Sequence, residues 1–354
     1  DTAHSDRQGP AAAGGRVRRA AAARAVRFAV LGAGAIGAYV GAALARGGAD
    51  VTLIARGEHL RAMTAYGVRV LSARGDFTVH PRATDDISAA ANADVVFVAL
   101  KAYSLTEIAP RLGSLLAPGA AVIWAQNGIP WWYFQSSPDA CGLTGLQSVD
   151  PGGVIATSIG PQHNIGCVVY CSTEIVEPGV IRHVEGTRFT LGEPDGTDSE
   201  RCRLIAAAFA AGQLRAPVES RLRDQIWLKL VGNVAFNPIT ALTGATLGEL
   251  GTVPEMRDLL RAIFAECAAV AARLGVTFPV SLDRRLEAGI AVGGHRTSML
   301  QDLEAGKRLE LGCMTGAIVE LAEHLDIDVP HTRAVHACVT LLDRLRAERR
   351  DRQS

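Results

Sequence analysis

The sequence predicts an α/β N-terminal domain of the Rossmann type followed by an all-α C-terminal domain. A glycine-rich turn lies between an apolar β run and a helical segment near the start of the chain. Strand and helix patterns alternate after it, which indicates a parallel sheet. Beyond about residue 220 every long segment has helical spacing. We therefore expect the first domain over residues 26–219 and the second over residues 220–347, after an extension of residues 1–25.

Composition excludes several classes of function. The 36 basic and 36 acidic residues balance, so nothing in the net charge points to nucleic acid. No uncharged apolar run is long enough for a membrane span. The seven cysteines are irregularly spaced, which predicts reduced thiols, no metal site and a cytoplasmic protein. The Ala-, Arg- and Gly-rich start of the chain buries little surface, so we expect residues 1–25 to be disordered.

The first domain is expected to begin at Val26, and its elements follow in order. "VRFAVLGAGAIG" is a β run that ends in glycines, and the helix after it stops at a Gly pair. "VRVLS" and "FTVH" predict a hairpin around Arg74-Gly75. Two continuously apolar runs, "VVFVAL" and "AVIWA", are typical of buried parallel strands.

The pattern changes after residue 165. Residues 165–193 predict two or three antiparallel strands joined by Pro-Gly and Glu-Gly turns. A short helix over 198–211 and a strand near 213–218 complete this domain, which places the boundary near residue 219. The expected helices of the second domain are 221–241, 255–273, 281–293 and, with breaks, 311–345.

The turn "GAGAIG" has the spacing of a dinucleotide-binding loop. Gly32 allows the tight turn, Gly34 lets the backbone approach a pyrophosphate, and Gly37 lets the helix pack closely on the strand. An Ala- and Gly-rich chain produces this spacing by chance as well, but here a strand precedes it and a helix follows. The predicted contacts are Gly32, Ala33, Gly34, Ala35, Ile36 and Gly37.

The end of the second strand predicts which dinucleotide binds. An NAD site commonly has an acidic residue about 20 residues after the glycines. Arg56 stands there instead. A guanidinium suits a 2′-phosphate and has no acceptor for a hydroxyl, which favours NADP(H). The alternative is a surface arginine in a loop.

Lys101 and Asn127 each follow a buried strand directly. The carboxyl ends of parallel strands share one edge of the sheet, where open α/β sheets bind their ligands. Either residue alone could be a loop residue, but both lie on the same edge as the glycine loop. We therefore predict that both face the ligand.

A polar row interrupts the apolar segment "DQIWLKLVGNVAFNPITALTG". Lys229, Asn233 and Asn237 are four apart and share one helical face. A solvated face is the alternative, yet the row has a single charge and two asparagines that disfavour a helix interior. A half-buried lysine with a lowered pKa can donate a proton. Pro238 predicts a kink or the end of this helix.

The carboxylate partner is harder to select. The segment "GHRTSMLQDLEAGKRLELG" contains a serine and three acidic residues that could face the row. Spacing alone selects none of them, and a solvated loop is the default for each. These candidates are Ser298, Asp302, Glu304 and Glu310.

The chain resembles the 2-dehydropantoate 2-reductase (ketopantoate reductase) family over about residues 26–345. The motifs that carry the resemblance are "VLGAGAIGAYVGAALA", "VALKAYS", "AQNGIPWW", "EPGVIRH", "WLKLVGNVAFNPITALTG" and "TSMLQDLEAGKRLEL". The resemblance implies a Rossmann domain that binds NADP(H) and a helical domain for substrate and catalysis, with the active site between them.

The resemblance also implies a role for each residue by position. Lys229 would donate the proton and Glu310 would be the active-site glutamate. Lys101 and Asn127 would face the nicotinamide end, and the glycine loop and Arg56 would bind the phosphates. The residues it implies for the substrate are Asn127, Asn233, Asn237 and, for the carboxylate, Ser298.

Some positions depart from the family pattern. Leu247 stands where a polar residue is expected, Leu311 and Gly312 follow Glu310 where an acidic residue is common, and "NGIPWWYF" is bulky. We expect these changes near the far end of the substrate, which leaves the natural 2-oxo acid open.

The expected reaction is NADPH-dependent reduction of 2-dehydropantoate to (R)-pantoate, in pantothenate and coenzyme A biosynthesis. One alternative is a paralogue that reduces another branched or aromatic 2-oxo acid. The other is a non-catalytic NADP(H)-binding sensor, which should have lost Lys229 or Glu310. The resemblance allows a monomer or a homodimer.

Overall fold

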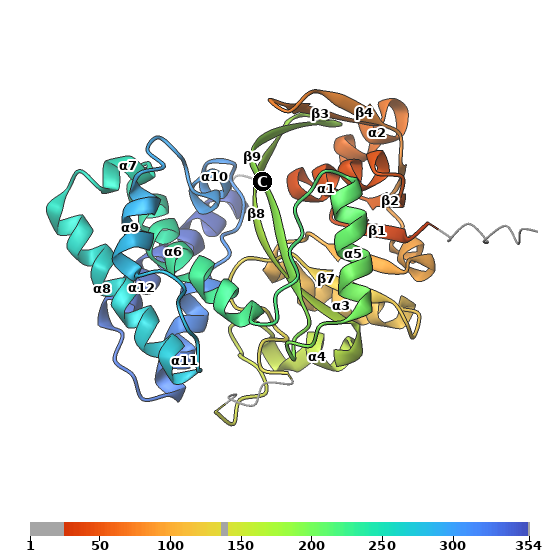
Figure 1. The fold of residues 1–354 in the computed structure, drawn as a ribbon. Helices are drawn as coiled ribbons and strands as arrows, with labels where there is room; N and C mark the ends of the chain where they lie inside the picture. The colour runs from red at the N-terminus through yellow and green to blue at the C-terminus, as the bar shows by residue number, and fades with distance from the viewer. Residues whose placement is uncertain (1–24, 136–140, 353–354) are drawn as a thin grey trace, which may run out of the picture.

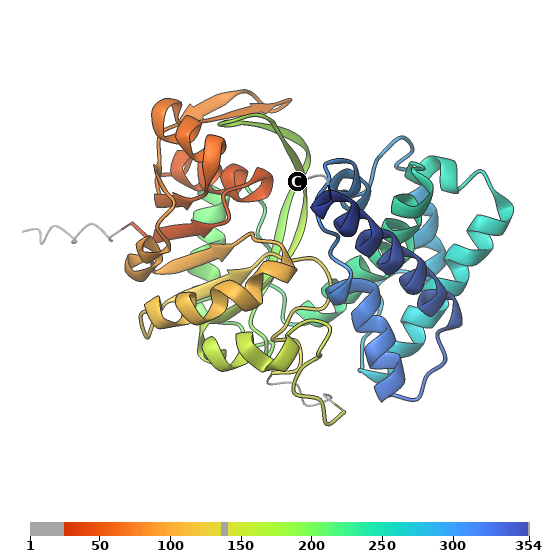
Figure 2. The same ribbon diagram turned by 180° about the vertical axis from the view of Figure 1, so that it is seen from behind.

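The computed structural model describes residues 25–135 and 141–352. The expected N-terminal extension lies outside these residues, except for its last residue. The described chain forms a sheet region followed by a helical region, which lie side by side in both views (Figures 1 and 2). The predicted fold class is therefore confirmed.

A single nine-stranded sheet forms the first region, in the order β4-β3-β9-β8-β7-β6-β1-β2-β5. Parallel pairing joins β5 to β2, β2 to β1, β1 to β6, β6 to β7 and β7 to β8. The continuously apolar runs predict this parallel arrangement. The strands are β1 Arg27–Leu31, β2 Asp50–Ile54, β3 Val68–Ser72, β4 Phe77–Val79, β5 Arg82–Thr84, β6 Val95–Val98, β7 Ala121–Trp124, β8 Asn164–Glu177 and β9 Val180–Gly192.

Helices cover both faces of the parallel strands, because successive side chains of a strand point to opposite faces. On β1, Phe28 and Val30 pack in the core with α1 and α5, whereas Ala29 and Leu31 pack in the core with α3. Figure 2 shows α3 on the side opposite to α1 and α5. The helices of this region are α1 Ala35–Arg46, α2 Gly57–Tyr66, α3 Leu105–Leu115, α4 Val154–Ser158 and α5 Glu200–Ala211.

The antiparallel segment consists of β8 and β9, two long strands with register shifts along their ladder. They lie at the boundary with the helical region (Figure 1). The expected strand near 213–218 forms only isolated bridges, Arg188 with Arg215 and Leu191 with Val218.

Helix α6, Leu222–Thr243, is the central element of the second region. It contacts β8 and β9 as well as α8, α10 and α12, and most of its residues are buried. Within the described residues, no helix combines the length and hydropathy that crossing a membrane requires. The other helices are α7 Leu247–Leu250, α8 Pro254–Arg273, α9 Leu282–Ile290, α10 Ser298–Glu304, a π-helical turn Gly312–Gly316, α11 Ala317–His324 and α12 Pro330–Asp351.

Pro238 does not end α6, contrary to one of the two predicted outcomes. The helix continues to Thr243 although proline removes one backbone hydrogen bond. Thr240 Oγ1 donates to the Asn237 carbonyl at 2.9 Å, and Ile239 and Thr240 are buried. Packing around the proline therefore maintains the helix.

Candidate active site

The glycine loop joins β1 to α1 with the geometry that a dinucleotide needs. Gly32 has φ +92°, which favours glycine, and a β-carbon on Gly37 would stand 2.3 Å from the Gly32 carbonyl oxygen. A β-carbon on Gly34 would meet nothing within 4 Å, so the start of α1 is open on that side. The first turn of α1 has no acidic residue and no side-chain cap. Its free N–H groups therefore fit a pyrophosphate.

Arg56 lies two residues after the end of β2, in the turn where the sequence places it. It precedes α2, its side chain is exposed, and it forms no ion pair within 4 Å in the described parts of the chain. The same edge of the sheet carries the glycine loop, since β1 and β2 are parallel neighbours. The guanidinium is thus free to bind an anion beside the loop.

Lys101 follows β6 and reaches across to the helical region. Its Nζ is 2.6 Å from Asp302 Oδ2 and 3.0 Å from Glu310 Oε2. The backbone N–H of Ala102 donates to the other oxygen of Glu310 at 2.9 Å. Burial alone would lower the pKa of Lys101, but the two carboxylates outweigh it and raise that pKa. Lys101 is therefore held as a cation.

Lys229 of α6 contacts the loop that follows β7, the strand next to β6. Its Nζ donates to Asn127 Oδ1 at 2.7 Å and to the Val169 carbonyl at 2.5 Å. It has no carboxylate within 4 Å among the described residues. Burial lowers the pKa of Lys229 to about 8, although the more distant charge of Glu310 opposes this shift. The amine is thus poised to release a proton near neutral pH.

The residues of the predicted polar row share one face of α6 but differ in burial and in hydrogen-bond partners, and the other predicted substrate residues lie apart from Lys229. Asn233 is half-buried one turn after Lys229, with no side-chain hydrogen bond among the described residues. Asn237 is buried, and its amide lies 3.8 Å from Met314 Sδ in the π-helical turn. Ser298 begins α10 and is exposed. Glu310 contacts Lys101 and does not contact Lys229 within hydrogen-bond distance.

Asp302 is one of the carboxylates between which sequence spacing does not choose. It is 8% exposed and bonds Lys101 at 2.6 Å. The signal for it was available in the sequence, because Asp302 follows Met299 by three positions and so shares the apolar face of α10. An acid on the buried face of a short helix predicts a buried partner. Glu304, in contrast, pairs with Arg296 near the surface.

The departures from the family pattern have packing explanations. Leu247 and Leu311 lie in the hydrophobic core, and a β-carbon on Gly312 would stand 2.2 Å from the Ser148 carbonyl oxygen. Trp132 lines a small cavity, about 20 Å³, beside Lys229 and Asn127. Tyr133 accepts a hydrogen bond from Trp227 of α6 at 2.8 Å. The bulky segment therefore fills the space between the sheet and α6.

The loop after β7 is fixed directly to the segment after Glu310. The Ile129 N–H donates to the Cys313 carbonyl at 2.7 Å. Gly128 has φ +88°, and a β-carbon on it would stand 2.1 Å from that same carbonyl oxygen. Only glycine allows this approach. Asn127 and Glu310 are thus positioned through one backbone contact.

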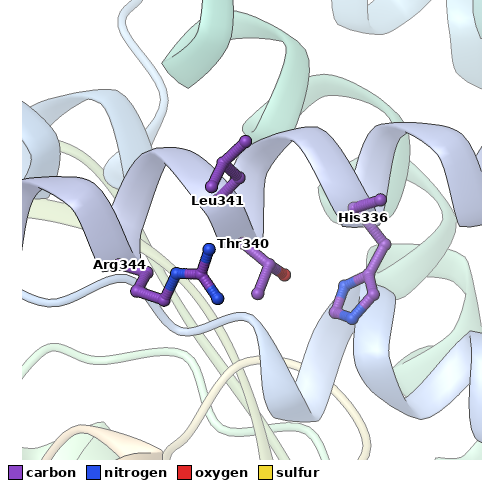
Figure 3. Close-up of a pocket in the computed structure, with 5 residues that line it drawn as sticks. His336, Thr340, Leu341 and Arg344 are labelled. Atoms are coloured by element: carbon purple, nitrogen blue, oxygen red, sulfur yellow. The ribbon is translucent and has the colours of Figure 1, made fainter.

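A second hollow, about 300 Å³, lies on the outer face of α12 (Figure 3). His336, Thr340 and Arg344 line it, with no residue of the sheet edge among its walls. Burial lowers the pKa of His336, so this histidine is mostly neutral at pH 7. The hollow lies apart from the lysines and is not part of the candidate active site.

Comparison with known proteins gives one consistent family. The model of ketopantoate reductase PanE/ApbA matches residues 28–196, and the model of its C terminal matches residues 221–343. A 2-dehydropantoate 2-reductase from Mesorhizobium japonicum is 43% identical over 92% of this chain and 99% of its own. One from Halobacterium salinarum is 32% identical over 92% of this chain and 100% of its own.

A solved structure has the same fold. The PanE/ApbA family ketopantoate reductase from Ralstonia eutropha superimposes with a TM-score of 0.79 at 29% identity, covering 91% of this chain and 100% of its own. With the two family models, these similarities extend over both regions. The chain therefore belongs to the ketopantoate reductase PanE/ApbA family and is a nicotinamide-dependent oxidoreductase acting on a keto or hydroxyl group.

Proposed function

We propose that this protein reduces 2-dehydropantoate to (R)-pantoate with NADPH, in pantothenate and coenzyme A biosynthesis. The observation that carries the proposal is Lys229, a buried amine with a pKa lowered to about 8, bonded to Asn127 at the sheet edge. The 43% identity to a 2-dehydropantoate 2-reductase supports the choice of substrate.

The cofactor would lie along the carboxyl edge of the sheet. The glycine loop and the start of α1 would bind the pyrophosphate, and Arg56 the 2′-phosphate. Lys101 and Asn127 would contact the nicotinamide end. When bound, the reduced nicotinamide supplies the hydride.

Lys229 provides the proton for the substrate carbonyl oxygen. A general acid works best with a pKa near the working pH, and such groups contribute about 10²- to 10⁴-fold in rate. Asn233, Asn237 and Ser298 would hold the oxygens of the substrate. Glu310 would act by fixing Lys101 and the backbone of Ala102, because those are the groups that it contacts.

The test is NADPH oxidation with 2-dehydropantoate beside a panel of branched and aromatic 2-oxo acids. We expect the highest kcat/KM with 2-dehydropantoate. Good turnover of another acid, with none of 2-dehydropantoate, would overturn the substrate and favour the paralogue. No turnover of any 2-oxo acid would favour an NADP(H)-binding sensor.

Arg56→Ala tests the cofactor. A lost charge-assisted contact of about 1.5–3 kcal/mol predicts a KM for NADPH raised about 10- to 100-fold, with the KM for NADH nearly unchanged. Arg61→Ala is the matched control, since Arg61 is an exposed arginine on α2, the helix that follows Arg56. An equal loss with both cofactors would remove Arg56 from the 2′-phosphate site.

A further inference from the structure

Arg285 of α9 has an unusual position against α6. Its Nε donates to the Leu228 carbonyl at 3.3 Å. A β-carbon on Gly232 would stand 2.8 Å from one of its terminal nitrogens, so the guanidinium lies where any other residue would place a side chain. The side chain is half-buried and forms no ion pair within 4 Å in the ranges that the structure describes. Its terminal nitrogens are thus available to a ligand.

Two other cations lie against the ring of Tyr170, and in the described chain they also lack a carboxylate within 4 Å. Arg188 of β9 donates to Thr190 Oγ1 and Gln225 Oε1, both at 2.9 Å, and both are neutral. The Arg188 guanidinium lies 5.1 Å from the ring centre of Tyr170, and Lys229 Nζ lies 5.7 Å from the same centre. Neither cation forms an ion pair within 4 Å in the described chain.

The charge of Arg285 affects the pKa of both Lys229 and Tyr170. Burial is the main cause of the lowered pKa of Lys229, and Arg285 adds to it. Burial raises the pKa of Tyr170, and Arg285 opposes that shift more than Arg188 does. Glu310, the carboxylate whose charge acts on Lys229, is held by Lys101. Arg285 therefore acts on both Lys229 and Tyr170 as a cation with no carboxylate within 4 Å in the described chain.

Half-buried cations of like charge are unfavourable unless an anion offsets them. A 2-oxo acid carries its carboxylate on the carbon next to the carbonyl that is reduced. Gly232 follows Lys229 by three positions, so a group seated there is one helical turn from the proton donor. A guanidinium offers two parallel donors that match a carboxylate.

We propose that Arg285, seated on Gly232, binds the carboxylate of the 2-oxo acid substrate. This inference rests on the proposed function and names the residue that makes the enzyme require an acid rather than a neutral ketone. Ser298, the residue that the family resemblance implies for this carboxylate, is exposed and neutral. Arg285 supplies the charge that a serine lacks.

The test uses Arg285→Gln in the full chain. Losing a bidentate charged contact of about 1.5–3 kcal/mol predicts that the KM for 2-dehydropantoate rises about 10- to 100-fold, with a smaller change in kcat. The Kd of pantoate for the NADP⁺ form, measured by calorimetry, should rise equally. The KM for the neutral amide of 2-dehydropantoate should stay within about twofold, because it has no carboxylate to lose.

Two more variants distinguish a loss of carboxylate binding from a general effect on folding. Gly232→Ala adds a methyl group that displaces the guanidinium while Arg285 remains, and we expect the same weakening of pantoate. Arg284→Gln, an exposed neighbour on α9, should behave as the wild type. A pantoate Kd for Arg285→Gln within twofold of the wild type would overturn the proposal.

If the proposed function itself is wrong, the results differ from those that would overturn the role of Arg285. In that case the wild-type protein neither reduces 2-dehydropantoate nor binds pantoate. The same variants are then measured with the 2-oxo acid that does turn over, where an unchanged KM in Arg285→Gln would overturn this inference separately. If no 2-oxo acid turns over, both proposals fail together.

Discussion

The two lysines of the candidate active site have the same side chain, but their surroundings shift their pKa values in opposite directions. Lys101, at the edge of the sheet, lies between Asp302 and Glu310, and its pKa is raised. Lys229, on α6, is bonded to a neutral amide and a carbonyl, and burial lowers its pKa to about 8. Partner chemistry, rather than burial alone, decides which amine stays charged and which can give up a proton.

Lys229→Ala should produce the largest effect. Removing the general acid should lower kcat by about 10²- to 10⁴-fold, while NADPH binding, measured by fluorescence titration, is retained. Arg284→Ala is the control, because Arg284 is an exposed cation on α9 with no ion pair within 4 Å in the described chain. A Lys229→Ala rate near that of the wild type would assign the proton to another group.

Lys101→Met should reduce stability, because it leaves Glu310 without its cation and Asp302 with only Lys307, whose Nζ lies 3.9 Å from Asp302 Oδ1. Breaking a buried ion pair costs about 3–5 kcal/mol, and partial exposure of Lys101 reduces our expectation to about 1–3 kcal/mol. Denaturant unfolding of the variant and the wild type measures the difference. Lys229→Met is the matched control, since it leaves no paired carboxylate behind.

The loss in Lys101→Met should depend on pH with a defined sign. The pKa of Lys101 is raised in the folded state, so the stability that its charge contributes is fully present at neutral pH and is lost as pH rises above about 10. The difference in stability between the variant and the wild type should therefore shrink at alkaline pH. A difference that stays constant from about pH 7 to about pH 11 would show that it does not come from the charge of Lys101.

The alkaline limb of the pH–rate profile should report Lys229. The reduction requires the protonated amine, so kcat/KM should fall about tenfold per pH unit above the pKa of about 8. Arg285→Gln should move this limb to higher pH, because it removes a positive charge that disfavours the ammonium. A limb that does not move would place Arg285 too far from Lys229 to matter.

The sequence was most informative where the signal is local. The glycine loop, the strand ends at Lys101 and Asn127 and the row on α6 follow from spacing within single elements. The bond of Lys101 to Asp302 joins residues 201 positions apart, which periodicity does not encode. The continuation of α6 past Pro238 depends likewise on tertiary packing, which overrides local propensity.

Gly128 has a consequence for the spacing of the two regions. The loop that carries Asn127 touches the segment after Glu310 at a point where a single methyl group has no room. Because Gly128 has no side chain, the two segments can approach this closely. The approach sets the distance between Asn127, which bonds Lys229, and Glu310, which bonds Lys101. A methyl group at residue 128 would change that separation without altering the chemistry of any catalytic side chain.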